Sequence, residues 1–280
     1  MMFNLTPVPI EVVDFYDDGE DSRHYHFRLN GVEKETMSAW GEAQHGQFFM
    51  LTLPGVGEAP FTFTALPNKQ GVFGALVRKI GSVTHALFQC EVGNIIGARG
   101  PFGNGWPTKS LAKQRILIIG GGCGIAPLAS MINELIDTQS YTQLEVIYAA
   151  RNRATLMLNP ERKRWQHCIP MFNVVEDIAG LDELDYYQGT AVGILPTVLH
   201  AFGEQPDRVF MAGPEGMMES AAEYLVAYGI EPTAIYLSIE RRMHCAVGLC
   251  GHCYLQNHYV CTNGPTFTWA KLQQCEAEYQ

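Results

Sequence analysis

Hydrophobic and polar positions alternate over short distances in the first third of the chain. Five runs rich in β-branched and aromatic residues predict strands at 9–15, 24–29, 47–53, 61–65 and 72–78. Glycine and asparagine residues separate these runs, as expected for turns. Such short strands predict a small antiparallel β-barrel. We expect one helix after them, with Ser82 as its N-cap and continuing through 85–88.

From about residue 111 the pattern changes to strands that alternate with helices. Apolar strands are predicted at 115–119, 144–149, 208–211 and 234–237. Helices are predicted at 127–136, with Pro127 in the first turn, and at 215–228. This alternation predicts an α/β domain whose parallel sheet is covered by helices.

The last stretch, from about residue 239, is short and rich in cysteine. A segment of this size cannot build a large hydrophobic core and needs a further source of stability, such as a metal centre. The pattern therefore predicts three parts. They are an antiparallel β-barrel at 1–109, an α/β parallel-sheet domain at 110–238 and a cluster-binding segment at 239–280.

Composition narrows the classes of function. The chain has 280 residues and a net charge of −10, which argues against binding to nucleic acid or to an anionic membrane surface. No apolar run reaches the roughly 18 residues that cross a bilayer, so membrane insertion is not expected. The first residues lack the basic and apolar parts of a signal peptide. We therefore expect a cytoplasmic protein.

Four of the eight cysteines crowd into 17 residues, with the spacing Cys245-x4-Cys250-x2-Cys253-x7-Cys261. In a reducing compartment a tight cluster of thiols indicates metal binding rather than disulfides. The first three cysteines follow the plant-type C-x4-C-x2-C run of a [2Fe-2S] site. The spacing therefore predicts these four residues as iron ligands.

A structural zinc site is the alternative interpretation of the same cysteines. Zinc is usually held by C-x2-C pairs, and only one such pair is present. His244, His252 and His258 lie close by in the sequence and keep the zinc interpretation open.

Two glycine loops are candidates for a nucleotide site. Residues 120–127 follow a predicted strand and open a helix, where backbone amides favour a pyrophosphate. Pro127 at the last position breaks a strict G-x-G-x-x-G, so a plain turn is the alternative. Residues 212–218 end a later strand, and ligands of such sheets bind at the carboxyl ends of strands.

Phosphate groups have further candidate partners. Residues 81–84 offer a second helix N-terminus, or else an ordinary capped helix, and Arg78 is near enough in the sequence to balance a phosphate charge. Arg151 and Arg153 follow the second strand of the parallel sheet, where an arginine can pair with the 2′-phosphate of NADP(H). The alternative is two solvated loop arginines.

Taken in order, these motifs resemble the ferredoxin–NADP reductase superfamily over nearly the whole chain. The chain is most similar to the branch that holds the gamma subunits of [NiFe] hydrogenases (sulfhydrogenases) and the electron-transfer subunits of anaerobic sulfite reductase and dihydroorotate dehydrogenase B. The matching runs are Gly57–Thr62, 78–84, 99–107, the glycine loop, 212–214, 240–245 with the other cysteines, and 259–265.

The resemblance implies a role for each motif. It places the hydroxyl or amide of Thr62, the catalytic candidate, near N5 of a flavin. The implied FAD residues are Ala59, Pro60, Phe61, Thr62, Leu76, Val77, Arg78, Gly81, Ser82, Val83 and Thr84. The implied nicotinamide nucleotide residues are Gly121, Gly122, Gly124, Ile125, Gly213 and Pro214. Two positions depart from the wider superfamily. Ala59 stands where arginine is usual, and Ala212 stands where cysteine is frequent.

By this resemblance the chain is an electron-transfer (diaphorase) subunit, an FAD-dependent oxidoreductase within a multisubunit complex. It would move electrons between NAD(P)H and an iron–sulfur-containing partner subunit through FAD and the [2Fe-2S] cluster. Residues 236–243 look most like hydrogenase gamma subunits. The corresponding subunit of anaerobic sulfite reductase and a free-standing ferredoxin–NAD(P) reductase are alternatives. A nucleotide-binding module with a zinc-stapled tail is an alternative from another class.

Overall fold

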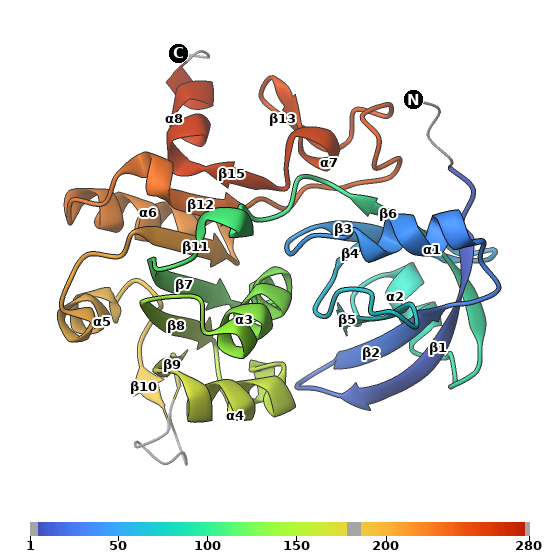
Figure 1. Cartoon of the computed structure of the whole chain (residues 1–280), viewed down its shortest axis with the longest axis horizontal. Coiled ribbons are helices and arrows are strands. Elements are labelled where there is room, and N and C mark those ends of the chain that lie inside the picture. Colours follow the sequence, from blue (N-terminus) through green and yellow to red (C-terminus); the bar gives the residue numbers. More distant parts are fainter. Residues whose placement is uncertain (1–4, 178–185, 278–280) are drawn as a thin grey trace. The chain divides into compact units, whose positions relative to one another are not determined.

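The computed structural model describes residues 5–177 and 186–277, and the chain forms two compact units (Figure 1). The first unit joins Met1–Trp106 with Glu240–Pro265, and the second joins Pro107–Ile239 with Thr266–Gln280. The cysteine-rich stretch therefore divides after Pro265, with its four clustered cysteines in the first unit.

The first unit is built on a six-stranded antiparallel sheet, which confirms the predicted fold class. Its strands are β1 (Val8–Asp17), β2 (Ser22–Leu29), β3 (Phe48–Leu53), β4 (Gly57–Thr62), β5 (Val72–Arg78) and β6 (Ile95–Phe102). Their order is β4-β3-β6-β1-β2-β5. A bridge between Ala65 and Gly74 links the segment after β4 to β5, so the two ends of the sheet approach each other.

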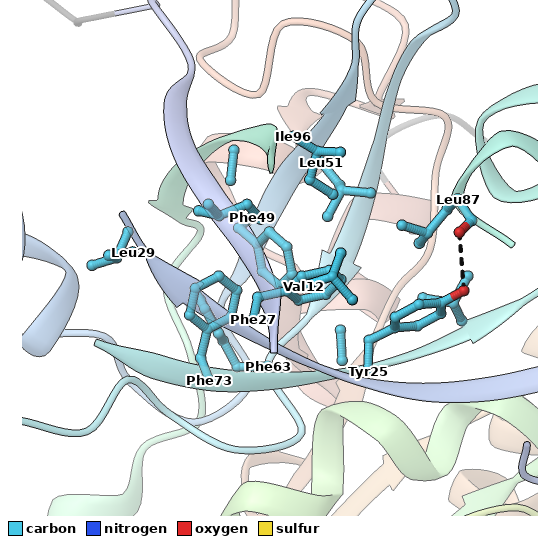
Figure 2. Packing of buried hydrophobic residues seen from close by; sticks show 14 of the residues in the cluster. Val12, Tyr25, Phe27, Leu29, Phe49, Leu51, Phe63, Phe73, Leu87 and Ile96 are labelled. Carbon is cyan, nitrogen blue, oxygen red and sulfur yellow. Dashed lines mark hydrogen bonds between the residues drawn. The ribbon is translucent and has the colours of Figure 1, made fainter. Parts of the chain in front are cut away.

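Aromatic side chains fill the interior of this sheet. The rings of Phe49 and Phe63 lie 4.8 Å apart, and Phe27 and Phe73 pack beside them with no exposed surface (Figure 2). Phe27, Phe49 and Phe73 lie on β2, β3 and β5, where the residues of this core alternate along the strand, which is why the pattern predicted these strands. Phe63 follows the end of β4, so the strand predicted at 61–65 was placed too late in the sequence. Tyr25 is also buried and donates its hydroxyl hydrogen to the Leu87 carbonyl at 3.1 Å.

Two helices accompany this sheet. Helix α1 (Lys34–Gly41) is mostly polar and buries only Trp40, so no apolar face predicted it. Helix α2 (Ser82–Leu87) lies where a helix was expected, but its N-cap is Gly81 and Ser82 is its first residue. The prediction of Ser82 as the cap was therefore wrong by one position. The hydroxyl of Thr84 turns back and accepts hydrogen bonds from the amides of Ile80 and Gly81 instead.

The second unit has a seven-stranded sheet of order β10-β9-β8-β7-β11-β12-β15. All pairs are parallel except that of β12 with β15. The strands are β7 (Arg115–Gly121), β8 (Gln143–Ala150), β9 (Met171–Val175), β10 (Tyr187–Gln188), β11 (Arg208–Ala212), β12 (Ile235–Ser238) and β15 (Thr266–Thr268). The helices are α3 (Ala126–Thr138), α4 (Asn159–Cys168), α5 (Leu195–Phe202), α6 (Glu215–Ala227) and α8 (Trp269–Ala277).

This strand order confirms the predicted α/β fold and creates a switch point. The chain moves from β7 to β8 on one side and returns to β11 on the other side. The carboxyl ends of β7 and β11 therefore diverge into separate loops, and ligands of such sheets bind there.

The cysteine-rich part of the first unit is mostly loop. It contains the short hairpin of β13 (Tyr254–Leu255) and β14 (His258–Tyr259), followed by α7 (Val260–Asn263). Its chain is tied back to the strand sheet by the amide of Asn104, which donates to the Gly264 carbonyl at 2.7 Å.

Candidate cofactor sites

Strand β4 is the edge of the first sheet, and none of its six residues is buried. The side chains of Ala59 and Phe61 pack partly against the aromatic core, while Pro60 and Thr62 are also half-buried. A proline fits an edge position because it has no amide hydrogen to give to a further strand. The residues of this motif thus remain partly exposed along the edge.

The other implied flavin residues lie on β5 and at the start of α2. Leu76 is nearly buried and Arg78 is exposed, but Val77 has no exposed surface and belongs to the aromatic core. Val77 can therefore meet a ligand only through its backbone.

The first backbone amides of α2 have no acceptor within the helix. The amides of Ser82, Val83 and Thr84 precede the first helical hydrogen bond, from His85 N to the Gly81 carbonyl at 2.9 Å. The Gly81 amide already donates to the Thr84 hydroxyl at 2.9 Å. Of the implied phosphate residues, Ser82, Val83 and Thr84 thus retain donors for an anion.

The two glycine loops of the second unit touch each other. A Cβ on Gly124 would lie 2.3 Å from the carbonyl carbon of Ala212 and 2.4 Å from the Gly213 nitrogen. A Cβ on Gly121 would lie 2.9 Å from the ring of Pro214. The contact therefore requires glycine, and the structure brings the two loops together at the switch point. Ile125 is fully buried, so its side chain supports the loop from within.

Arg151 follows β8 at the same edge of the sheet, and its side chain is exposed, as is that of Arg153. The Arg151 carbonyl accepts the amides of Glu176 at 3.2 Å and Asp177 at 3.3 Å. This fixes the backbone and leaves the guanidinium available.

The cysteine loop turns its backbone amides towards sulfur. Cys245 Sγ accepts from the amides of Val247, Leu249 and Cys250 at 3.3–3.5 Å. Cys261 Sγ accepts from the Gly248 amide at 3.2 Å. Amides aimed at thiolate sulfurs stabilise the charge of an iron–sulfur cluster and tune its potential.

Two of the four thiols lie at close range in the interior of the cysteine-rich loop. Cys253 Sγ and Cys261 Sγ lie 3.2 Å apart and are nearly fully buried, while the Cys250 amide points at Cys245 Sγ. Across the described residues, no three His, Cys, Asp or Glu side chains converge as ligands of a single metal ion. The preference for a two-iron cluster over zinc therefore rests on the C-x4-C-x2-C spacing and on the amides directed at the sulfurs.

The electrostatics of the thiols follow from their surroundings. The His252 amide lowers the pKa of the exposed Cys250 thiol to about 7. Burial, with the Cys253 thiol beside it, raises the pKa of Cys261. A buried thiol of this kind becomes a thiolate when a metal ion binds it. The donor set therefore fits an iron–sulfur centre.

Sequence reasoning missed two residues at these sites. In the sequence Arg99 is only the first residue of a motif, but in the structure its guanidinium donates to the carbonyls of His244 and Cys245. Tyr148 was noticed only as part of a strand, although its hydroxyl donates to the Gly122 carbonyl at 3.1 Å. Their partners are distant in sequence, so no local pattern could reveal them. Among the described residues, no helix has the length and apolar character needed to cross a membrane.

Two regions of the chain match known protein families. Residues 118–223, which contain both glycine loops, match the Oxidoreductase NAD-binding domain family. Residues 240–273, which contain the four cysteines, match the Iron-sulfur cluster binding domain of dihydroorotate dehydrogenase B.

Similar proteins cover almost the whole chain. Sulfhydrogenase 1 subunit gamma of Pyrococcus furiosus is 30% identical over 93% of this chain and 90% of its own length. A probable dihydroorotate dehydrogenase B (NAD(+)) electron transfer subunit of Pyrococcus horikoshii is 32% identical over 82% of this chain and 81% of its own length. In structure, the NADH-dependent reduced ferredoxin–NADP oxidoreductase superposes with a TM-score of 0.73, at 22% identity, over 96% of this chain and 93% of that chain.

Proposed function

Because the chain belongs to the electron-transfer branch of the ferredoxin–NADP reductase superfamily, with the sulfhydrogenase gamma subunits and dihydroorotate dehydrogenase B electron transfer subunits, we propose that it is the diaphorase subunit of a multisubunit complex. It is an oxidoreductase of that family, whose cofactors are FAD, a [2Fe-2S] cluster and NAD(P)H. When bound, FAD would supply the exchange between two-electron hydride chemistry at the nicotinamide and one-electron chemistry at the cluster.

The residues of the chain bind and orient these groups. Ala59–Thr62 and the start of α2 would hold the flavin. The loops at 121–125 and 213–214 would hold the dinucleotide, and the four cysteines would hold the cluster. Thr62 at the end of β4 would orient the flavin through its hydroxyl or amide. The proposed chemistry needs no side-chain nucleophile, so the protein's part is position and electrostatics.

One observation carries the proposal. The cysteine loop and the flavin strand β4 belong to one folded unit, and Arg99 bonds to both at Glu58 and at Cys245. A single unit that holds both groups supports electron transfer between them. A tail stapled by zinc would need no such connection.

We propose a hydrogenase-type partner, since two sulfhydrogenase gamma subunits of Pyrococcus furiosus cover at least 80% of the chain. The match of residues 240–273 to the dihydroorotate dehydrogenase B domain favours a dihydroorotate dehydrogenase as the second candidate. The cytoplasm is the compartment we propose, because its reducing conditions preserve free thiols for a metal centre.

The proposed hydrogenase-type partner can be tested by purifying the tagged chain together with its native partner under exclusion of oxygen. The proposed complex reduces NAD(P)+ with hydrogen, and it loses this activity when the chain is removed. Reduction of NAD+ by dihydroorotate would support the second candidate instead. A chain isolated without a partner that reduces ferredoxin directly would contradict a subunit role.

A further inference from the structure

Arg99 on β6 is a buried cation that joins two regions distant in sequence. Only 6% of the residue is exposed. Its Nε and Nη2 donate to the two carboxylate oxygens of Glu58 at 3.0 and 2.5 Å. Its Nη1 donates to the Cys245 carbonyl at 3.1 Å, and Nη2 also donates to the His244 carbonyl at 3.2 Å.

Glu58, the ion-pair partner of Arg99, is also held by a residue of the neighbouring strand β3. It lies opposite Thr52 in the β3–β4 ladder and accepts the Thr52 hydroxyl at 2.5 Å. Burial alone would raise the pKa of Glu58, but the hydrogen bonds from Arg99 and Thr52 hold it below its usual value. Glu58 is therefore a carboxylate, and it directly precedes the first flavin residue, Ala59.

The fork geometry of arginine explains why this residue type stands here. A guanidinium carries five N–H donors in a plane and can bind a carboxylate with one edge and carbonyls with the other. Lysine has one nitrogen and cannot hold both groups in a fixed geometry. Arg99 thus fixes the backbone at the first cluster cysteine relative to β4.

The positive charge of Arg99 also affects the reduction potential of the cluster. Iron–sulfur potentials depend on nearby charge and hydrogen bonding, and reduction adds one negative charge to the centre. A cation beside Cys245 stabilises the reduced state, while an unpaired carboxylate at Glu58 opposes it.

We propose that Arg99 is a positioning residue that orients Cys245 and, in balance with Glu58, sets the reduction potential of the cluster. The proposal rests on the proposed function, because it requires a cluster on the four cysteines.

Removing the cation and removing the carboxylate should shift the midpoint potential of the cluster in opposite directions. Arg99→Met leaves Glu58 unpaired near the cluster and shifts the midpoint potential to more negative values. Glu58→Gln leaves Arg99 uncompensated and shifts it to more positive values. Redox titration of the holoprotein, followed by electron paramagnetic resonance of the reduced cluster, measures both. Arg28→Met is the matched control, because Arg28 forms an ion pair with Glu11 elsewhere on the same sheet. It leaves the potential unchanged.

Arg99→Lys separates charge from geometry. It keeps the potential close to that of the wild type, while loss of the fixed fork broadens the resonance signal. If Arg99→Met does not fold, Arg99→Lys and Glu58→Gln together still decide the question.

Two kinds of failure are distinguishable. A wild-type protein without a [2Fe-2S] signal overturns the proposed function. A normal wild-type signal whose potential does not move in Glu58→Gln and Arg99→Met, or moves in the same direction in both, overturns only the role of Arg99. A purely structural Arg99 would lower thermal stability without the opposite shifts.

Discussion

The hydroxyl of Tyr148 joins the glycine loop to the loop that follows the next strand. It donates to the Gly122 carbonyl at 3.1 Å and accepts the Met157 amide at 3.0 Å. Tyr148 has no exposed surface, so these hydrogen bonds are made away from water. One side chain thus sets the spacing of two loops at the edge where a dinucleotide binds.

Tyr148→Phe removes both hydrogen bonds and leaves the buried Met157 amide without this acceptor. The cost of an unsatisfied buried group is about 1–3 kcal/mol. We expect NAD(P)H to bind several-fold more weakly, measured by calorimetric titration, while the cluster spectrum stays the same. Tyr228→Phe at an exposed position is the control and leaves the affinity unchanged. Equal affinities for Tyr148→Phe and wild type would contradict the role of the hydroxyl.

Gly124→Ala places a methyl group against the backbone of Ala212 and Gly213. Backbone cannot move aside as a flexible side chain can, so the two glycine loops must separate. We expect at least a tenfold loss of NAD(P)H affinity, together with lower thermal stability. Gly41→Ala at the end of α1 is the control, because a Cβ there also meets nothing within 4 Å and lies outside the nucleotide loops. An unchanged dinucleotide affinity in Gly124→Ala would show that contact between the loops is not required.

Local patterns in the sequence predicted most strands and the order of the parts. Alternating aromatic residues such as Phe27 and Phe49 marked the first sheet, and the 17-residue cysteine spacing marked the cluster site. Strand β6 was not predicted as a strand, because its run Arg99–Phe102 has glycine and proline where β-branched residues are usual. Strand β15 was not predicted because three residues carry too little pattern.

The connections between motifs could not be predicted, since they depend on distant partners. Arg99 reaches Cys245 across 146 positions of the chain. The division of the last segment after Pro265 arises from pairing of β15 with β12, which tertiary structure decides. Motifs in the sequence thus allow candidate site residues to be proposed, whereas the residues that hold these motifs together emerge only from tertiary structure.

Arg151→Ala tests the nucleotide preference. A charge-assisted hydrogen bond to a phosphate contributes about 1.5–3 kcal/mol, so we expect NADPH to bind about tenfold more weakly. NADH, which lacks the 2′-phosphate, keeps its affinity. Arg164→Ala on the exposed face of α4 is the control, since Arg164 pairs with Asp137. Equal losses for both nucleotides, or none, would contradict a phosphate contact.

Two buried histidines with lowered pKa values, His24 and His45, make stability depend on pH, and the pKa of His24 is the lower of the two. Burial, with His26 beside it, lowers the pKa of His24 to about 3, and Nε2 lies 2.7 Å from the Thr64 hydroxyl. The unfolded chain takes up this proton below about pH 6.5, but the folded chain does not. Stability is therefore present above pH 6.5 and falls progressively as the pH is lowered towards 3. The part due to His24 is about 2 kcal/mol by pH 5.

His24→Gln keeps a hydrogen-bonding group for Thr64 but does not titrate. Thermal unfolding between pH 7 and pH 5 should show a smaller loss of stability in this variant than in wild type. His200→Gln at an exposed position is the control and retains the wild-type slope. If the stability of His24→Gln fell with pH as steeply as that of the wild type, groups other than His24 would cause the acid sensitivity.

Iron, acid-labile sulfide and flavin in protein purified without oxygen test the central claim most directly. We predict about two irons and two sulfides per chain, with one flavin. Cys253→Ala loses the iron, whereas Cys168→Ala, at an exposed thiol on α4, retains it. One zinc ion per chain, no sulfide and no flavin would contradict the account.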